Sequence, residues 1–207
     1  MGLATWLLLA LLLRAERPRE RWQVAAAVVI ATAGEYVLSV VFGLYRYRLG
    51  NLPSFVPPGH GLVYLAALAL ARSPRFVRHG RGVRRLALAI GGAWAVWGIT
   101  AAARPDALGL LLFALFALFA WLGRAPLVYA AAFLLTTYLE LVGTALGNWT
   151  WAERAAGGLL TMGNPPSGVP GVYCLLDALA LACGSALAGR HERAGGAGAP
   201  LRAAGPG

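Results

Sequence analysis

The sequence contains no lysine and little charge of either sign. Its 18 basic side chains are all arginines, and Asp and Glu together number only eight among 207 residues. Without lysine, the chain cannot hold retinal as a Schiff base. The two cysteines, Cys174 and Cys183, lie in one apolar segment, and the three histidines are scattered. This pattern favours neither a disulfide nor a zinc or haem site, and we expect no metal and no organic cofactor.

Apolar residues dominate the composition. Hydrophobic side chains make up 59% of the chain and charged ones 13%, and the mean hydropathy is +0.65. Such a composition is typical of a polytopic membrane protein. The net charge of +10 comes from arginines between apolar segments, where the positive-inside rule expects them. We therefore expect a lipid bilayer as the partner, and no nucleic acid.

Six apolar segments have about the length of a helix that crosses a bilayer. A shorter one, residues 3–13, is a seventh span, an interfacial helix or a signal segment. We predict an all-α, polytopic transmembrane helical bundle of six or seven spans. It forms one domain over residues 1–193, followed by a disordered cytoplasmic tail over 194–207. The six segments lie at about 23–44, 56–72, 86–102, 107–122, 126–146 and 169–189.

The placement of arginine orients these spans. The loop at 73–85 carries five arginines and marks the cytoplasmic side. By alternation, the C-terminus is cytoplasmic and the loops at 45–56 and 147–168 are extracytoplasmic. We expect a multi-pass protein of the plasma membrane, and a homo-oligomer is compatible with this arrangement.

Two stretches of the chain share one design. A Thr stands three residues before Glu35 in one and before Glu140 in the other. In both, a Gly then precedes two alternating aromatic residues, and a double proline and a tyrosine follow. We interpret this as an internal duplication of a helix–loop–helix unit over 23–72 and 126–189. An even number of spans separates the copies, so the repeat is parallel, unlike the inverted repeats of many transporters.

Three carboxylates lie inside apolar segments: Glu35, Glu140 and Asp177. An ionised carboxylate there is costly unless it is paired, hydrated or protonated. Each shares a helical face with small, hydroxyl-bearing or aromatic residues, which helix–helix packing would also explain. We favour a shared internal site, in which these acids and His60 are the candidate catalytic residues. His60 follows a Pro-Pro-Gly turn and could instead cap an interfacial helix.

Aromatic side chains accompany these acids. An aromatic belt at the membrane surface would explain some of them, but ring faces also stabilise cations. Carboxylic acids beside aromatic walls, without metal ligands, suit the protonation of an alkene and the stabilisation of the carbocation that forms. The candidate substrate-binding residues are Tyr45, Tyr47, Tyr64, Trp149, Trp151 and Tyr173.

Two patches resemble the membrane carotenoid hydratases, which hydrate the acyclic ends of carotenoids. They are FGLYRY at 42–47 with the following Val-Pro, and GNWTW at 147–151 with GVPGVY at 168–173. The family's Thr-Gly-x-Pro lead and its central Asp element are absent. The resemblance implies a multi-span fold and places these residues in the site: Glu35, Gly43, Tyr45, Tyr47, Trp149 and Trp151.

We therefore expect an integral membrane enzyme that acts on a lipid-soluble isoprenoid, such as a carotenoid, by acid-initiated hydration or isomerisation. Glu35 and Glu140 would be the proton donor and the cation-stabilising base, in either order, and His60 and Asp177 would orient or relay protons. Two alternatives stay open. The same acids could form the cation pathway of a small transporter or proton-coupled channel, or the chain could be a non-catalytic membrane scaffold.

Overall fold

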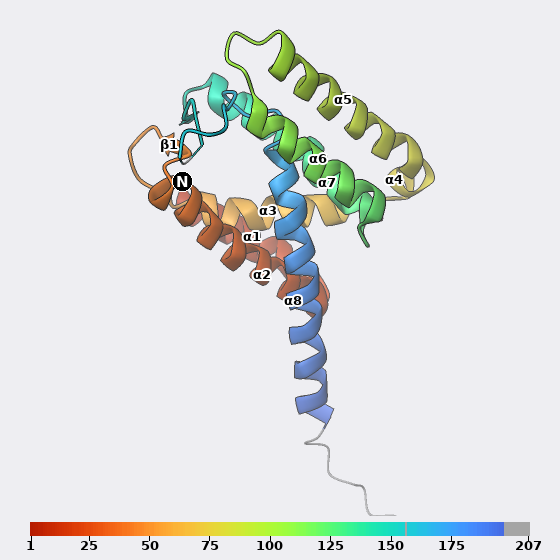
Figure 1. Cartoon of the computed structure of the whole chain (residues 1–207). Coiled ribbons are helices and arrows are strands. Elements are labelled where there is room, and N and C mark those ends of the chain that lie inside the picture. The colour runs from red at the N-terminus through yellow and green to blue at the C-terminus, as the bar shows by residue number, and fades with distance from the viewer. Residues whose placement is uncertain (156, 197–207) are drawn as a thin grey trace, which may run out of the picture.

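The computed structural model describes residues 1–155 and 157–196, and most of this part of the chain is helical (Figure 1). Several helices begin with a proline, whose fixed φ suits the first turn and whose missing N–H has no helical partner there. Residues 194–196 of the predicted tail continue the last helix, and 197–207 lie outside the described residues. The helices are α1 (Gly2–Leu13), α2 (Pro18–Glu35), the π-helix η1 (Tyr36–Val41), α3 (Val56–Arg72), α4 (Pro74–Arg78), α5 (Gly80–Thr100), α6 (Ala107–Leu122), α7 (Pro126–Ala145) and α8 (Pro170–Gly196).

Within residues 1–155 and 157–196, three stretches of helix are long and apolar enough to cross a membrane. They are Pro18–Val41 with 24 residues, Pro126–Ala145 with 20 and Pro170–Leu187 with 18. Two further apolar helices, α1 and α6, are shorter. Each of the six predicted segments overlaps a helix, as expected of long apolar runs, since a helix satisfies its own backbone hydrogen bonds in an apolar phase.

The first turns of α2 lie against the second half of α8. Gly184 marks the close approach, because a Cβ there would lie 2.5 Å from the Cα of Gln23. At the same junction, the Arg19 guanidinium donates a hydrogen bond to Ser185 Oγ at 3.2 Å. Figure 1 shows that α8 then extends beyond the other helices. Small residues at such a crossing let two helix backbones pack directly.

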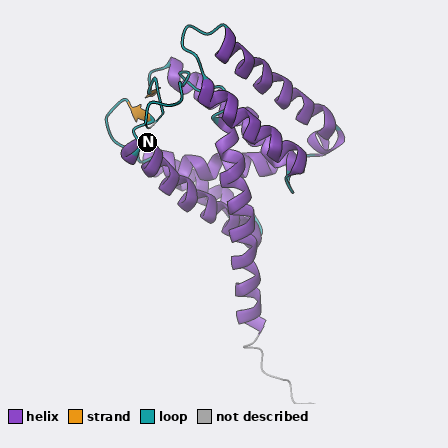
Figure 2. Ribbon diagram, viewed as in Figure 1, coloured by secondary structure: helices purple, strands orange, loops and turns teal. Residues whose placement is uncertain are grey.

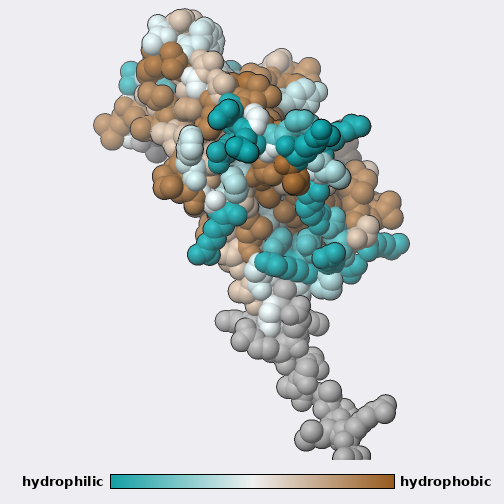
Figure 3. Space-filling view, turned by 90° about the vertical axis from the view of Figure 1, so that its right-hand side faces the viewer, coloured by the Kyte–Doolittle hydropathy of each residue, from teal (hydrophilic) through white to brown (hydrophobic). Residues whose placement is uncertain are grey.

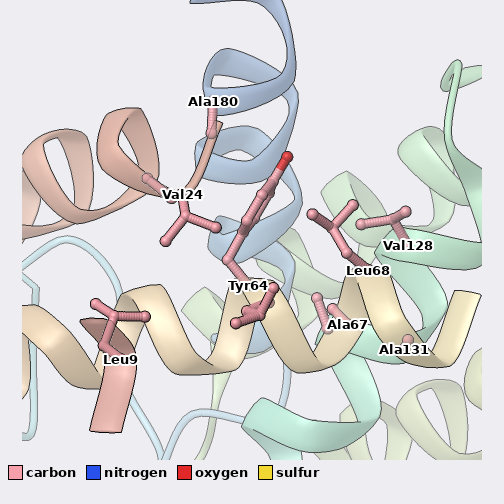
Figure 4. Packing of buried hydrophobic residues seen from close by; sticks show 11 residues of the cluster. Leu9, Val24, Tyr64, Ala67, Leu68, Val128, Ala131 and Ala180 are labelled. Carbon is pink, nitrogen blue, oxygen red and sulfur yellow. The ribbon is translucent and has the colours of Figure 1, made fainter. Parts of the chain in front are cut away.

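Two of the three apolar cores of the described residues lie between the α-helices, and the third lies at a short β-ribbon. The first joins α1, α2, α3, α7 and α8, with Tyr64 of α3 near its middle (Figure 4). The second joins α5, α6, α7 and α8 around the stacked rings of Phe116 and Phe133, whose centroids lie 3.8 Å apart. Between membrane helices, this kind of close van der Waals packing supplies much of the attraction.

A two-stranded antiparallel ribbon joins the two predicted repeat units. β1 (Tyr45–Tyr47) pairs with β2 (Trp149–Trp151), so that the first residue of each strand faces the last residue of the other. Aromatic residues favour strands, and the ribbon lies at the end of the molecule where several loops gather (Figure 2). The prediction of an all-α architecture is therefore correct for the helices, but it did not include this two-stranded ribbon.

Short irregular segments bring the strands to the helix ends. α2 passes into η1 directly after Glu35, and π-helical turns are frequent at functional sites. Gly43 and Gly147 then precede the strands with φ angles of 61° and 67°, a conformation that glycine adopts without strain. The same residue type thus makes the same turn in both units.

One buried carboxylate fixes the loop between β2 and α8. Asp106 caps the start of α6 and also accepts hydrogen bonds from the backbone N–H groups of Gly163 (2.8 Å) and Ser167 (2.6 Å). In the same loop, Asn164 Oδ1 accepts a hydrogen bond from the N–H of Trp151 at 3.0 Å. Asp106 therefore holds the loop in place beside the ribbon.

Much of the molecular surface is apolar. Figure 3 shows broad hydrophobic areas between separate groups of hydrophilic side chains. Large exposed hydrophobic residues on α2, on η1 and directly after it include Val29, Val41 and Phe42. Contiguous apolar surface of this kind is uncommon on soluble monomers and suits contact with lipid.

Candidate functional site

A cavity of about 350 Å³ lies between the helix ends and the ribbon, a volume within the usual range for small-molecule sites. Its walls come from α2, η1, α3, α7, α8 and both strands. Most of the lining residues are apolar. Eight of the ten candidate catalytic and substrate-binding residues predicted from the sequence line the cavity: Glu35, Tyr45, Tyr47, His60, Glu140, Trp149, Trp151 and Tyr173.

Glu35 is the centre of a first cluster. Its Oε2 accepts hydrogen bonds from the hydroxyls of Tyr45 (2.5 Å) and Tyr47 (2.7 Å). Its Oε1 lies 3.0 Å from Nε2 of His60, at the start of α3. Side chains two residues apart on a strand share a face, so β1 presents both phenols to the end of α2. Protein donors thus occupy both carboxylate oxygens of Glu35.

The phenols of β1 serve as neutral donors. Burial raises the pKa of Tyr45 and of Tyr47 well above the ordinary value, and the neighbouring Glu35 carboxylate raises both further. Each hydroxyl therefore keeps its proton, and the carboxylate is the acceptor in both hydrogen bonds.

Glu140 is the centre of a second cluster. Its Oε2 accepts hydrogen bonds from the indole N–H groups of Trp149 (2.9 Å) and Trp151 (3.1 Å). Trp149 lies so close to Gly143, one turn further along α7, that a Cβ there would overlap the ring. Glu140 is only 8% exposed, and none of the ion pairs among the described residues involves it.

Aromatic rings from both units contact each other across the ribbon. The ring centroids of Tyr45 and Trp151 lie 4.5 Å apart, and those of Tyr47 and Trp149 lie 6.1 Å apart. These rings occupy the cross-strand positions of the ribbon. The cavity therefore has an aromatic wall to which both strands contribute.

Several polar atoms of the cavity lining have no hydrogen-bond partner among the described residues, and two of them belong to the acid clusters. One is Nδ1 of His60, whose other ring nitrogen is held by Glu35. The other is Oε1 of Glu140, whose second oxygen takes both indole hydrogen bonds. Both side chains line the cavity, and neither atom is among the fully buried ones that lack a partner. Both atoms are therefore available to a ligand.

Two predicted residues, Tyr64 and Asp177, do not line the cavity. Tyr64 is buried in the first core, with its hydroxyl 3.5 Å from Gln23 Oε1. Asp177 is buried in α8, and its Oδ2 has no hydrogen-bond partner among the described residues. It shares a helical face with Tyr173, but the next turn of α8 presents Leu176 to the cavity instead of Asp177.

The threonine hydroxyls next to the two acids in α2 and α7 do not form hydrogen bonds with the carboxylates. Thr32 Oγ1 donates to the carbonyl of Val28 (2.6 Å), and Thr144 Oγ1 donates to the backbone carbonyl of Glu140 (2.6 Å). Serine and threonine in helices often bind their own backbone in this way. Aromatic donors from the ribbon satisfy the two acids instead.

Several residues that shape the site were not predicted from the sequence. Gly143, Thr136, Phe55 and Asn148 line the cavity, and Asp106 fixes the adjacent loop. An acid such as Asp106, directly before a long apolar run, is a helix-capping signal that could have been used. No group of three or more His, Cys, Asp or Glu in residues 1–155 and 157–196 is placed to hold a metal ion.

Apolar helices of membrane-crossing length and a cavity lined by two acids are consistent with a class, that of helical membrane proteins with an internal acid–aromatic site. Comparison with protein-family models, with curated proteins and with solved structures finds no match to this chain. A function therefore has to come from the chemistry of the site.

Proposed function

We propose that the chain is an integral membrane enzyme that hydrates or isomerises a double bond of a lipid-soluble isoprenoid, such as an acyclic carotenoid. The observation that carries this proposal is that Glu35, Glu140 and the aromatic residues of both strands surround one largely apolar cavity. Such a cavity accommodates a hydrocarbon and places acids beside it. The resemblance of the two aromatic patches to membrane carotenoid hydratases supports the same class of substrate.

Glu140 has the position of the proton donor. Its carboxyl group is buried, has no basic partner among the described residues and leaves Oε1 unbonded. A carboxyl group in such surroundings is easily retained as the neutral acid. In the proposed first step, the proton moves from Oε1 to one alkene carbon, and the electron pair of the π bond forms the new C–H bond. A carbocation then lies beside the Glu140 carboxylate and the aromatic wall.

The Glu35–His60 pair has the position of the base. When Nε2–H of His60 donates to Glu35 Oε1, Nδ1 carries a lone pair and can accept a proton. In hydration, the oxygen of a water molecule binds the cation while His60 takes a proton from that water, which gives an alcohol. In isomerisation, His60 instead takes a proton from the neighbouring carbon. The proton then returns through water to Glu140, and the enzyme is regenerated.

Tyr45 and Tyr47 act on this base indirectly. Their hydroxyls fix Oε2 of Glu35, so the other oxygen of Glu35 keeps its place at His60. A carboxylate that sets the tautomer and orientation of a histidine serves the same purpose in hydrolase triads. Both tyrosines are therefore positioning residues.

Turnover with an acyclic carotene tests this proposal. We expect the purified protein in lipid to yield a product heavier by one water molecule, with the label incorporated when the water carries heavy oxygen. Glu140→Gln and His60→Gln should each lower turnover at least about 100-fold. Glu153→Gln, in the exposed loop after β2, is the matched control and should be fully active. Full activity of both Glu35→Gln and Glu140→Gln would remove the mechanism.

We further propose a multi-pass plasma-membrane topology of six or seven spans with a parallel repeat, a cytoplasmic C-terminus and the ribbon outside. The overlap of each predicted segment with a helix and the five arginines at 73–85 support it. So does the pairing of β1 with β2, which lets equivalent loops lie at one end of the molecule. In whole cells, a cysteine replacing Arg46 should react with an impermeant thiol reagent, and one replacing Arg78 should not.

One observation favours a second function, proton-coupled transport. Asp177 is a buried acid without a hydrogen-bond partner for its Oδ2 in the described chain, one turn from Tyr173 at the cavity. Buried acids of this kind serve as proton carriers in transporters. Reconstituted vesicles should then show proton-dependent flux that Asp177→Asn abolishes. An enzyme of the kind proposed above shows turnover without flux.

A further inference from the structure

We infer that the cavity binds a lipophilic ammonium ion, with the charged nitrogen between Glu140 Oε1 and the aromatic wall. The hydrocarbon part of such a ligand would lie along the apolar lining. This inference rests on the ligand-binding role proposed above for the cavity, and it does not depend on any reaction there.

When Glu140 is ionised, the charges at the cavity are not balanced. Among the described residues that line it, His60 is the one basic side chain, and Glu35 already holds it at 3.0 Å. Glu140 receives hydrogen bonds from two neutral indoles and forms none of the ion pairs of the described residues. A buried carboxylate is stable as an anion only when a counter-charge is present. A cation on the ligand would provide it.

The geometry at Glu140 leaves room for that cation. Trp149 and Trp151 both bind Oε2, so Oε1 remains available at the cavity. Tyr47 and Tyr173 contribute further rings to the lining. Quaternary ammonium groups have no N–H to donate and are recognised by aromatic rings within about 6 Å together with a nearby negative charge.

The remainder of the lining selects against other ligands. Leu38, Val56, Val63 and Leu139 are apolar, which suits an alkyl chain better than a sugar. An anionic ligand would meet two carboxylates and would find the histidine of the lining already paired. A lipophilic ammonium ion is also the stable analogue of a carbocation, so the same arrangement would serve the proposed reaction.

A long-chain trimethylammonium probe tests the inference. The purified protein in an uncharged detergent is titrated with dodecyltrimethylammonium, and separately with its isostere in which a quaternary carbon replaces the nitrogen. Ligand-dependent thermal stabilisation gives the apparent affinity of each. We expect the wild type to bind the ammonium at least about 10-fold more tightly than the isostere.

Glu140→Gln keeps the shape of the site and should abolish this preference. Glu153→Gln removes an acid away from the cavity and should keep it. Equal affinity of the wild type for the two probes, or an unchanged preference in Glu140→Gln, would overturn the inference. If the ammonium binds as expected but no isoprenoid is turned over, the proposed enzyme function fails and the inference stands. If an isoprenoid is turned over without any ammonium preference, the enzyme function stands and the inference fails.

Discussion

The two carboxylates at the cavity occupy similar places and are bound differently. Glu35 accepts two phenol hydrogen bonds on one oxygen and faces His60 with the other. Glu140 accepts two indole hydrogen bonds on one oxygen and has no partner for the other among the described residues. We call Glu35 the closed carboxylate, because both of its oxygens have protein partners, and this suits it to hold a neighbouring residue. We call Glu140 the open carboxylate, because one of its oxygens has no partner among the described residues, and this suits it to act on a ligand.

A difference between the following loops explains the contrast. In the first unit, the Pro-Pro-Gly turn starts α3 and places His60 against Glu35. In the second unit, the corresponding double proline follows Asn164, which binds the backbone of Trp151 instead of the acid. No histidine is present in that loop. The two acid–aromatic clusters therefore differ in the loop that follows each aromatic pair.

Removing the closed carboxylate should have the largest effect. Glu35→Ala leaves the buried phenol of Tyr45 and the half-buried phenol of Tyr47 without their acceptor, and it breaks the contact with His60. We expect a loss of about 3–5 kcal/mol in the free energy of unfolding. Glu140→Ala leaves only two indole N–H groups unpaired and should cost about 2 kcal/mol. Thermal unfolding of the purified variants in detergent measures both. A larger loss for Glu140→Ala would contradict the distinction between a closed and an open acid.

The two units also differ in how closely their aromatic residues approach the helix. A Cβ on Gly143 would overlap Trp149, whereas one on Gly34, which also lines the cavity, would meet nothing within 4 Å. Gly143→Ala should therefore cost about 1–3 kcal/mol through overpacking and change the fluorescence of Trp149. Gly34→Ala is the matched control and should be neutral or stabilising by up to about 1 kcal/mol. Equal effects of both substitutions would exclude direct packing of Trp149 on α7.

Residue pattern alone predicts the helices and much of the site. Acids within apolar runs, followed by alternating aromatic residues, predict that Glu35 and Glu140 share a chamber, and both line one cavity. The reason is physical, because an acid at that depth needs polar partners and the nearby rings carry O–H or N–H groups.

The remaining features depend on contacts between distant parts of the chain. β1 and β2 have three residues each and pair across about 100 residues of sequence, so local periodicity does not predict them. Helical spacing places Tyr173 and Asp177 on one face, but Tyr173 lines the cavity and the following turn contributes Leu176 instead of Asp177, which spacing does not predict. Asp106 acts through backbone groups more than 50 residues away, a contact that no local spacing predicts.

Removing one hydrogen-bond donor at a time compares the contributions of the two clusters to stability in more detail. Tyr45→Phe removes one of three donors to Glu35 and should cost about 0.5–1 kcal/mol. Trp151→Phe, at the cross-strand partner position, removes one of only two donors to Glu140 and should cost somewhat more, about 1–1.5 kcal/mol. Because the paired rings lie 4.5 Å apart, the double variant should depart from additivity. Strict additivity would indicate that the ring contact contributes nothing to stability.

The smallest expected difference concerns alkaline pH, since phenols titrate and indoles do not. The pKa of Tyr45 and of Tyr47 is raised in the folded protein, by burial and by Glu35. Below the ordinary phenol value of about 10 both states of the chain keep these protons, so their contribution to stability is complete. Above that value the unfolded chain loses them first, and stability falls as pH rises.

Between about pH 9 and pH 10 we expect these two phenols to account for a loss of roughly 0.7 kcal/mol. The Tyr45→Phe/Tyr47→Phe double variant should therefore show a shallower decline of its melting temperature with pH than the wild type. The Trp149→Phe/Trp151→Phe variant is the matched control and should decline as steeply as the wild type, because it lacks no titrating group. Parallel declines in all three proteins would mean that the phenols ionise as freely in the folded state as in the unfolded one, which the hydrogen bonds to Glu35 do not allow.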